Sequence, residues 1–486
     1  MGVKLIKDLV HNYISIDDDI QKIVDTSSFQ RLRRIRQLSC NYIFPSTNHT
    51  RYEHSLGVMQ LACIFFDKLR QDMIKLKLTE SEIDNLKNHL KMASILHDIG
   101  HPPFSHLGEK FLDEKEIFNA IKEEFSNKIS VEETFLDENG KIVGKEHELL
   151  SCYVILRNFS NILNEIDKNI DISFICRCII GNEYRQDMDW SKNICINILN
   201  SDSIDVDKLD YLMRDNHMAG EIAPKMDITR LLNCIFISDD KKIKFVAKAI
   251  PAVQSIIDSR DSLYLWVYHH HISIYTDYVT CRIINRCIEL YNENKNSFEG
   301  INRQHFFSPR AISDNLITDD DIYSHLRKIY INRKSEFIDD FNKIAIEQIF
   351  ERKFLKSLWK TIYEYKDFEN MLLKEGYINS YDDISEIIEN KNEIESITKN
   401  ISKKLNIHEA EIFIITKHNK FYNATVETPT YIYLNGEDRK LSELLPQKFY
   451  TKFREMLFFV FAPSEKIDDV KNELIEEIKK RIKRID

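Results

Sequence analysis

Three short segments, far apart in the sequence, hold residue types that bind divalent metals. His97 and Asp98 are adjacent in L-H-D-I-G-H, His54 ends the segment R-Y-E-H, and Asp207 lies in V-D-K-L-D-Y. Neutral imidazoles and carboxylates suit a divalent transition metal, and a bound metal can act as a Lewis acid on phosphorus. One His–Asp pair arises easily by chance in a chain with 16 histidines. The prediction of a metal site therefore rests on all three segments together.

A second group of histidines follows the His–Asp pair. The segment H-P-P-F-S-H-L-G-E contributes His101, His106 and Glu109, and K-E-H-E contributes His147. Hydrolysis of a phosphate ester needs a protonated group near the leaving oxygen and a carboxylate that fixes the tautomer of that imidazole. Isolated histidines are usually structural, as we expect for His217. Three of them close to a candidate metal site are better explained by catalysis.

The elements that must position these residues are expected to be helices. Apolar residues recur at three- and four-residue spacing over residues 55–75, 84–98 and 147–166, and residues 254–292 form another long, mostly helical stretch. His54 then lies at the start of one helix, and His97 and Asp98 lie at the end of another. Side chains from different helices can converge at such ends.

The composition changes after about residue 400. Short β-branched and aromatic segments at 411–416, 422–428 and 430–434 predict strands of an antiparallel sheet, with a further strand at 457–462 and a charged helix at 466–484. We expect a mainly α fold. A helical catalytic domain would span residues 1–300, and a smaller α+β lobe with a small antiparallel sheet would span residues 301–486.

Charge and composition exclude some classes of protein. The net charge of −10 argues against a chain-wide attraction for nucleic acid, although it does not exclude an anionic substrate. The nine cysteines are scattered, which favours reduced thiols over metal ligands. Nothing resembles a secretory signal, and the longest apolar runs are too short to span a bilayer. We therefore expect a soluble, cytoplasmic protein.

The chain resembles the HD-domain deoxynucleoside triphosphate triphosphohydrolases, in which the H…HD…D set defines the metal site. It is most similar to the vertebrate branch that carries an N-terminal sterile-alpha-motif domain, which we do not find in this chain. The similarity includes D-T-S-S-F-Q-R-L-R-R-I-R-Q-L, F-P-S-T-N-H-T-R-Y-E-H-S-L-G-V and V-D-K-L-D-Y-L-M-R-D. Further matches are S-R-D-S-L-Y-L-W-V-Y-H-H and, near the C-terminus, L-S-E-L-L-P-Q-K-F.

The resemblance implies a role for each candidate residue. The metal ligands would be His54, His97, Asp98 and Asp207, and the sequence does not distinguish Fe, Mn, Zn or Ni, nor does it exclude additional Mg²⁺. The catalytic group at the α-phosphate would be His101, His106, Glu109 and His147. Contacts to the triphosphate would come from Arg51, Lys208 and Arg260. Glu109 stands where the family branch has a shorter acid, and the longer side chain would shift the position of its imidazole partner.

Recognition of the deoxynucleoside follows from the same resemblance. The sugar and its 3′-hydroxyl would be recognised by Gln37, Tyr211 and Asp215. Leu38 and Tyr268 would crowd the 2′ position, where burial of an unpaired ribose hydroxyl is costly. His269 would face the base.

The resemblance extends in part to a regulatory site. Lys4, Asp25, Gln30 and Arg33 match residues that bind an activating guanine nucleotide at a subunit interface of the family, whereas Lys7 replaces an amide residue there. We find no equivalent of a basic strand that completes that site. Allosteric activation therefore stays open beside the alternative that these residues are ordinary surface charges. The resemblance also implies a homo-oligomer, either a dimer or a tetramer.

The expected reaction is hydrolysis of a dNTP to the deoxynucleoside and inorganic triphosphate. One alternative is an HD phosphodiesterase or nuclease that acts on cyclic or single-stranded nucleotides, which would share the metal ligands. The other is a nucleotide sensor without catalysis, although no ligand or acid is missing. The sequence leaves open the base preference, the native metal and the biological role, whether control of nucleotide pools or antiviral defence.

Overall fold

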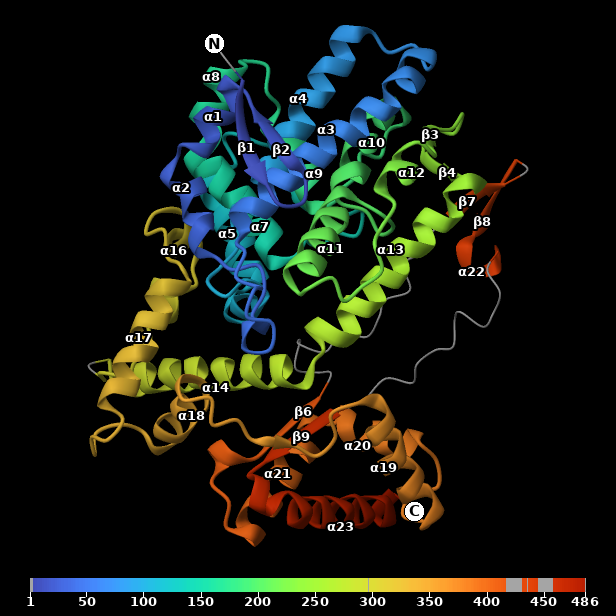
Figure 1. Ribbon diagram of the computed structural model, residues 1–486. Helices are drawn as coiled ribbons and strands as arrows, with labels where there is room; N and C mark the ends of the chain where they lie inside the picture. The colour runs from blue at the N-terminus through green and yellow to red at the C-terminus, as the bar shows by residue number, and fades with distance from the viewer. Residues whose placement is uncertain (1–2, 296, 417–430, 435, 445–457, 486) are drawn as a thin grey trace. The chain divides into compact units, whose positions relative to one another are not determined.

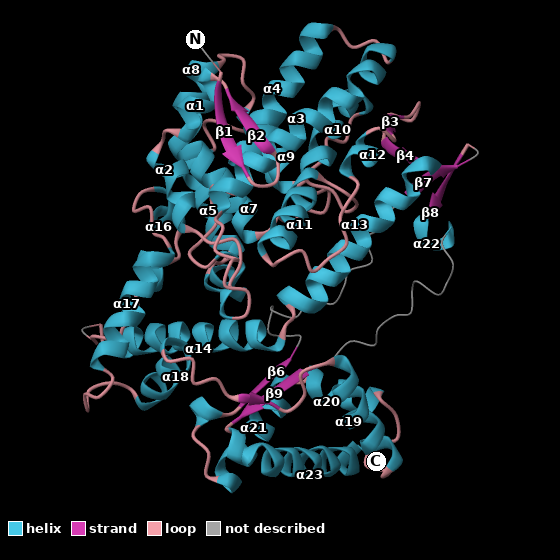
Figure 2. Ribbon diagram, in the orientation of Figure 1, coloured by secondary structure: helices cyan, strands magenta, loops and turns pink. Residues whose placement is uncertain are grey.

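The computed structural model describes residues 3–295, 297–416, 431–434, 436–444 and 458–485 (Figure 1). The chain is mainly helical with a few small sheets (Figure 2), which confirms the predicted fold class. It divides into two compact units. Unit 1 contains the residues up to Tyr264, Arg303–Asp321 and the described residues between 431 and 444, and unit 2 contains the rest. The predicted domain boundary at residue 300 stays a prediction.

Unit 1 begins with a β-hairpin that we did not predict from the sequence. Strands β1 (Lys4–Asp8) and β2 (Asn12–Ile16) pair antiparallel, with Lys4 opposite Ile16. The turn between them closes at Asn12, which has a φ of 64°. Asparagine tolerates this left-handed conformation better than most residues. The side chains of Ile14 and Ile16, both in β2, are buried.

Helices α3 (Arg51–Lys75), α4 (Glu80–Leu96) and α11 (Val206–Met218) hold the candidate metal ligands. Both long helices begin with a capping box, since Glu53 accepts a hydrogen bond from the Thr50 backbone at 3.1 Å and Glu82 accepts one from the Thr79 backbone at 2.8 Å. Helix α3 packs against both α4 and α11. This packing brings the start of α3 and the end of α4 to the same part of the unit (Figure 1).

Further helices surround these three in unit 1. Their bounds are α1 (Asp18–Val24), α2 (Ser27–Gln30), α5 (Glu114–Phe125), α6 (Val131–Phe135), α7 (Glu146–Val154), α8 (Ser160–Ile166), α9 (Ile172–Ile180), α10 (Trp190–Leu199), α12 (Ile228–Leu232), α13 (Ile250–Leu263) and α16 (Pro309–Ser313). The predicted helix over 147–166 is thus α7 and α8, joined by one π-helical turn at Ile155–Phe159.

A four-stranded sheet in unit 1 has the order β3-β4-β7-β8, with β3 (Ile235–Ile237), β4 (Ile243–Val246), β7 (Tyr431–Leu434) and β8 (Glu437–Lys440). Strand β7, which contains most of the predicted strand at 430–434, pairs with β4 in parallel, Phe245 lying opposite Ile432. The C-terminal strands therefore belong to two different sheets, whereas the sequence had predicted one antiparallel sheet.

Unit 2 contains the second of these sheets. Its order is β5-β9-β6, and β6 (Phe413–Thr416) pairs antiparallel with β9 (Phe458–Ala462), close to the predicted bounds. The short strand is β5 (Lys356–Ser357), and the helices are α14 (His271–Glu293), α17 (Asp319–Asn332, which begins in unit 1), α18 (Asp340–Phe350), α19 (Ile362–Lys374), α20 (Asp382–Glu389), α21 (Lys391–Leu405) and α23 (Ile467–Ile485). The predicted strand at 422–428 lies outside the described residues.

Two further features bear on the class of protein. Within the described ranges, no helix is both long enough and apolar enough to cross a bilayer. The nine cysteines are free thiols, and all of them are buried except Cys63, which is half-buried.

Candidate metal and catalytic site

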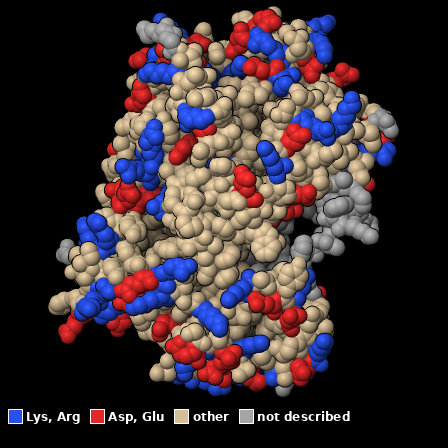
Figure 3. Space-filling model, viewed as in Figure 1, with Lys and Arg blue, Asp and Glu red and all other residues tan. Residues whose placement is uncertain are grey.

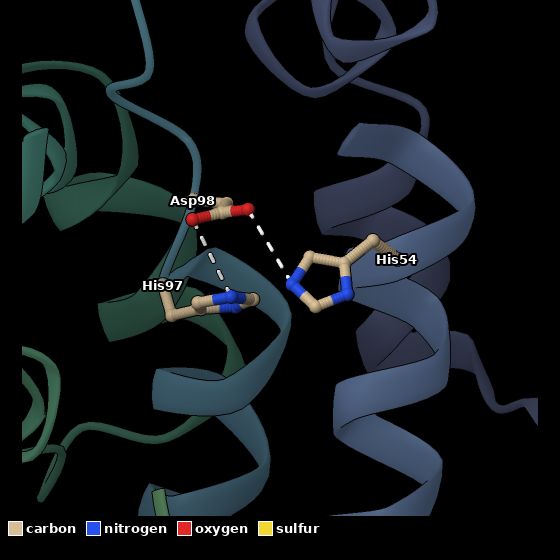
Figure 4. A group of neighbouring side chains, drawn as sticks. All are labelled: His54, His97 and Asp98. Atoms are coloured by element: carbon tan, nitrogen blue, oxygen red, sulfur yellow. Dashed lines mark ion pairs between the residues drawn. The ribbon is translucent and has the colours of Figure 1, made fainter. Parts of the chain in front are cut away.

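The candidate metal ligands converge in unit 1 from three helices. His54 lies in the first turn of α3, His97 and Asp98 follow the last residue of α4, and Asp207 lies in the first turn of α11. Nε2 of His54 lies 2.9 Å from Oδ1 of Asp207 and 3.6 Å from Oδ2 of Asp98. Nε2 of His97 lies 3.4 Å from Oδ1 of Asp98 (Figure 4) and 3.7 Å from Oδ1 of Asp207.

The hydrogen bonds of the two imidazoles determine which nitrogen faces this centre. Nδ1 of His97 donates to the backbone carbonyl of Ser94 at 2.8 Å, and Nδ1 of His54 donates to Oδ2 of Asp210 at 2.8 Å. Each ring therefore keeps a proton on Nδ1 and directs Nε2 toward the centre. Nε2 of His54 carries a second proton, which it donates to Oδ1 of Asp207 at 2.9 Å and which a metal ion would displace. Among the described residues, the buried Nε2 of His97 has no hydrogen-bond partner. An unpaired nitrogen of this kind fits a metal ligand.

The electrostatics of the cluster also favour a bound cation. Burial opposes protonation of His54, but hydrogen bonds to Asp207 and Asp210 raise the pKa of this imidazole to about 10. Burial likewise opposes ionisation of Asp98, yet the charge of Arg51 holds the pKa of this carboxyl well below its usual range. The carboxylates therefore stay ionised, and their negative field favours positive charge at the centre. His54, His97 and Asp98 could together hold a metal ion.

The second histidine group lies beside the first and is organised around one carboxylate oxygen. Oε1 of Glu109 accepts a hydrogen bond from Nδ1 of His106 at 2.8 Å and lies 2.8 Å from Nδ1 of His147. The rings of His101 and His147 are stacked, with their centroids 4.3 Å apart. Nε2 of His101 lies 3.1 Å from Oδ1 of Asp98, so the two groups are contiguous.

The imidazoles of this group differ in exposure and in charge. The side chain of His106 is 65% exposed, whereas those of His101 and His147 are buried. Burial, with the nearby charge of Arg51, holds the pKa of His101 well below its usual range. Burial acts in the same direction on His147, but the charge of Glu109 outweighs it and raises the pKa of that ring. Neighbouring groups with opposite pKa shifts are typical of acid–base sites.

Glycine lets the backbone of the first group approach α7. Gly100, between the His–Asp pair and His101, donates its backbone N–H to Oγ of Ser151 at 2.9 Å. A Cβ at this position would lie 2.1 Å from the backbone nitrogen of Ser151. Because α7 also carries His147, the absence of a side chain at residue 100 allows the two histidine groups to meet.

The predicted triphosphate contacts have different surroundings. Arg51 lies within the site, where its guanidinium donates to Oδ2 of Asp98 at 2.7 Å and to Oγ of Ser105 at 3.1 Å. The ammonium of Lys208 is paired with Asp205 at the start of its own helix. Arg260, in α13, hydrogen-bonds to its neighbour Asp261 at 3.2 Å.

Two of the predicted sugar-binding residues are linked through His49. Nε2 of His49 lies 2.8 Å from Oδ1 of Asp215, and the backbone carbonyl of His49 accepts from the Gln37 backbone at 3.0 Å. The buried Oε1 of Gln37 has no hydrogen-bond partner within the described chain. Tyr211 precedes Asp215 by one turn of α11, and Leu38 is half-buried beside Gln37. Tyr268 and His269 belong to unit 2, so their part in the site stays a prediction.

The four predicted regulatory residues line one pocket of about 460 Å³, next to the hairpin: Lys4, Asp25, Gln30 and Arg33. The guanidinium of Arg33 stacks on the ring of Tyr52, 3.5 Å from its centroid, and its Nε donates to Gln30 at 2.9 Å. Tyr52 also lines the pocket and lies in the first turn of α3, two residues before His54. The pocket and the metal cluster therefore share the start of one helix.

Sequence reasoning missed two residues that contact the candidate site. Asp210 is the second aspartate of V-D-K-L-D-Y and is not among the predicted site residues, although it accepts a hydrogen bond from Nδ1 of His54. The available signal was its spacing, because a residue three positions after Asp207 lies on a neighbouring part of the same helix. His49, which contacts Asp215, gave no signal in the sequence.

Comparisons with known proteins agree with this geometry. Residues 51–169 match the HD domain family, a range that includes His54, His97 and Asp98 but ends before Asp207. The chain is 31% identical over 270 residues to the deoxynucleoside triphosphate triphosphohydrolase SAMHD1 homolog of Dictyostelium discoideum, covering 55% of this chain and 46% of that protein. It is 29% identical over 287 residues to the human deoxynucleoside triphosphate triphosphohydrolase SAMHD1, covering 56% and 42%.

A solved structure shares the fold over a larger part of the chain. A phosphohydrolase from Bacteroides thetaiotaomicron superposes with a TM-score of 0.63 at 20% identity, covering 94% of this chain and 99% of that one. The chain spans about half the length of the curated relatives described above. The resemblance predicted from the motifs is confirmed, and residues 51–169 of this chain form an HD domain.

Proposed function

We propose that the chain is a metal-dependent phosphohydrolase that converts dNTPs to the deoxynucleoside and inorganic triphosphate. The observation that carries this proposal is the contact between two groups: a His–Asp cluster suited to a metal, and three imidazoles arranged around Glu109. The similarity to triphosphohydrolases supports the choice of substrate.

In this proposal the metal is held by His54, His97, Asp98 and Asp207, through the nitrogen and oxygen atoms that converge there. When bound, it supplies Lewis-acid polarisation of a phosphoryl oxygen. Arg51 lies close enough to balance negative charge on the phosphates, because it already pairs with Asp98 inside the site. Lys208 and Arg260 would have to leave their present acidic partners, Asp205 and Asp261, to reach a triphosphate.

We assign the transfer of a proton to the leaving 5′-oxygen to His106. Its ring is the exposed member of the group, so a substrate can reach it, and Glu109 holds its Nδ1. This arrangement orients Nε2 away from the carboxylate, where Nη2 of Arg51 lies 3.4 Å from it. To donate from Nε2 the ring has to be doubly protonated, with Arg51 turned to the phosphates. His147 shares the same carboxylate oxygen from a buried position, and we assign it the role of fixing Glu109.

Selection of a deoxyribose would depend on the polar cluster around His49. Asp215 and Gln37 supply a carboxylate and an unpaired buried amide oxygen, which suit the 3′-hydroxyl as hydrogen-bond acceptors. Tyr268 and Leu38 would exclude a 2′-hydroxyl by crowding. Replacement of Tyr268 by Ala should then relax discrimination against ribonucleotides, and unchanged selectivity would remove it from the sugar site.

The pocket beside the hairpin is proposed as a site for an activating nucleotide. Its lining residues Lys4 and Arg33 offer positive charge to phosphates, and Asp25 and Gln30 offer groups that can hydrogen-bond to a base. We also propose that the protein acts as a homo-oligomer. Nucleic acid is a less suitable partner, because Lys and Arg side chains intermingle with Asp and Glu over the described residues on the face in Figure 3.

Product analysis tests the proposal directly. Purified protein is incubated with each dNTP and NTP in Mn²⁺ or Mg²⁺, alone and with the other nucleotides present as activators. Release of deoxynucleoside with intact triphosphate is the expected result. No release under any condition, from protein that retains metal, would overturn the assignment and direct the search to cyclic and single-stranded substrates.

A further inference from the structure

The turn of the N-terminal hairpin reaches the residues behind the metal cluster. His11, in the turn between β1 and β2, places its Nε2 at 2.6 Å from Oδ1 of Asp210. The two side chains are 7% and 0% exposed, so water does not compete for this contact. Because the ionised carboxylate of Asp210 can only accept, the His11 ring donates the proton. The other oxygen of the same carboxylate accepts from Nδ1 of His54.

The conformation of the turn is set by a second hairpin residue. Oδ1 of Asp8 accepts from the backbone N–H groups of Val10 and His11, both at 2.8 Å. Its Oδ2 accepts from Nη1 of Arg214 at 2.8 Å. Asp8 therefore holds His11 in place with one oxygen and joins the turn to helix α11 with the other.

Arg214, in α11, is the third side chain that donates to the Asp210 carboxylate. Its Nε donates to Oδ2 of Asp210 at 2.9 Å and its Nη2 donates to Oδ1 at 3.1 Å, one helical turn apart. Asp210 thus receives N–H groups from three side chains: His11, His54 and Arg214. A carboxylate held by a bidentate arginine and two imidazoles has little rotational freedom.

Helix α3 leaves space for this set. A Cβ on Gly57, one turn after His54, would lie 1.9 Å from Oδ1 of Asp210 and 2.5 Å from Nη2 of Arg214. Asp210 and Arg214 therefore press directly against the helix that carries His54, at a position where only glycine leaves room. His11 of the hairpin and Gly57 of α3 therefore both lie against Asp210 and limit its movement.

We propose that Asp8 and His11 are positioning residues for the metal site. They hold the Asp210 carboxylate where it accepts the hydrogen bond from Nδ1–H of His54, so that Nε2 of His54 is directed to the metal. This inference rests on the proposed function, because it takes His54 as a metal ligand. Groups that orient a ligating histidine in this way typically change metal affinity by roughly 10–100-fold when they are removed.

Binding of Mn²⁺ alone, without nucleotide, tests the inference in the full chain. We expect His11→Ala to bind Mn²⁺ about ten-fold more weakly than the wild type and to lose it faster to a chelator. His11→Gln should recover part of the affinity, because an amide N–H can replace the imidazole donor. The matched control is Leu9→Ala in the same turn, where the side chain is 69% exposed, and it should behave as the wild type.

Asp8→Asn provides a second variant if His11→Ala does not fold, as judged by circular dichroism. The asparagine oxygen can still accept from the turn, but the charge that faces Arg214 is lost, so weaker Mn²⁺ binding is again expected. If His11→Ala folds and binds Mn²⁺ with wild-type affinity, the inference is overturned and the proposed function stays intact. If only Asp8→Asn folds, wild-type affinity of that variant for Mn²⁺ has the same meaning. Failure of the wild type to bind Mn²⁺, Fe²⁺, Zn²⁺ or Ni²⁺ would instead overturn the metal assignment itself.

Discussion

Nε2 of His54 and Oδ1 of Asp207 lie 2.9 Å apart, although 153 residues separate them in the chain. Helix α3 carries the first and α11 the second, and both residues lie in the first turn of their helices. The opposite nitrogen of the same ring is held by Asp210. One imidazole therefore lies between two carboxylates of a single helix, with its Nε2 directed to the cluster.

This arrangement predicts that metal and turnover are lost together. His97→Ala and Asp207→Ala each remove one donor from the centre, so the metal content measured by elemental analysis should fall to background. Hydrolysis of dNTPs should drop by roughly 10²–10³-fold or more, the cost of removing one electrostatic contact to a transition state. Asp202→Asn, at an exposed residue in the loop before α11, is the matched control. Activity in a variant without metal would contradict the assignment.

Because one oxygen of Glu109 contacts two imidazoles, we expect its charge to affect kcat more than it affects the binding of metal or substrate. Glu109→Gln keeps the shape but loses the charge that faces His106 and His147, so kcat should fall by about 10²-fold, as for other acid–base groups. Metal content and KM should change little. Glu138→Gln, an exposed acid between α6 and α7, is the control. A loss of metal equal to the loss of kcat would show that Glu109 supports the metal instead.

The buried carboxyl of Asp319, which is not one of the candidate catalytic groups, should make the stability of the protein depend on pH. Burial raises the pKa of Asp319 to about 6, against 3.8 for an unperturbed carboxyl, although it accepts from the Phe104 and Arg36 backbones. A carboxyl whose pKa is higher in the folded than in the unfolded state stabilises the folded protein when the pH is below the unfolded pKa. This contribution is lost as the pH rises through the folded pKa of about 6. The free energy of unfolding of the wild type, relative to Asp319→Asn, should fall by about 1 kcal/mol from pH 5 to pH 7.

The control for this measurement is Asp320→Asn, because the neighbouring Asp320 is 68% exposed. Its effect on the free energy of unfolding should be the same at both pH values. A difference between the wild type and Asp319→Asn that does not vary with pH would show that the carboxyl of Asp319 titrates normally in the folded protein.

The pocket beside the hairpin predicts different effects for two adjacent arginines. Arg33→Glu places negative charge inside the pocket and removes the stacking on Tyr52, so nucleotide binding there and any activation should weaken at least ten-fold. Arg34→Glu changes the same charge, but Arg34 is 69% exposed and pairs with Asp320, so binding should be retained. Binding is measured by fluorescence of a labelled guanine nucleotide. Equal effects of the two variants would indicate a general change in surface charge.

Steric contact predicts that Gly100 tolerates no side chain. A Cβ there would meet the backbone of Ser151, which cannot move without shifting α7, so Gly100→Ala should destabilise the protein by about 1–3 kcal/mol. Thermal unfolding measures this effect. Ser151→Ala, which removes only the hydrogen bond to the Gly100 backbone, should cost about 1 kcal/mol. A smaller effect of Gly100→Ala than of Ser151→Ala would show that the loop and α7 can separate.

Local sequence determined the elements that carry the site. Periodicity placed His54 at a helix start and the His97–Asp98 pair at a helix end, because the core-facing residues of a helix repeat at three- and four-residue spacing. The same spacing places Tyr211 and Asp215 on one side of α11. The motifs of these segments also carried the resemblance to HD-domain triphosphohydrolases. Residue types and spacing were sufficient for these points because they depend only on neighbours along the chain.

Only the tertiary structure decided which groups act on one another. The contacts of Asp210 with His54 and His11, and of Glu109 with two imidazoles, join segments whose spacing has no fixed relation in sequence. The hairpin and the parallel pairing of β7 with β4 were likewise missed. Long-range pairing is selected by packing of whole elements, and a short apolar segment is compatible with several partners. The direction of each ring nitrogen follows from that packing, and so does the chemistry that we propose.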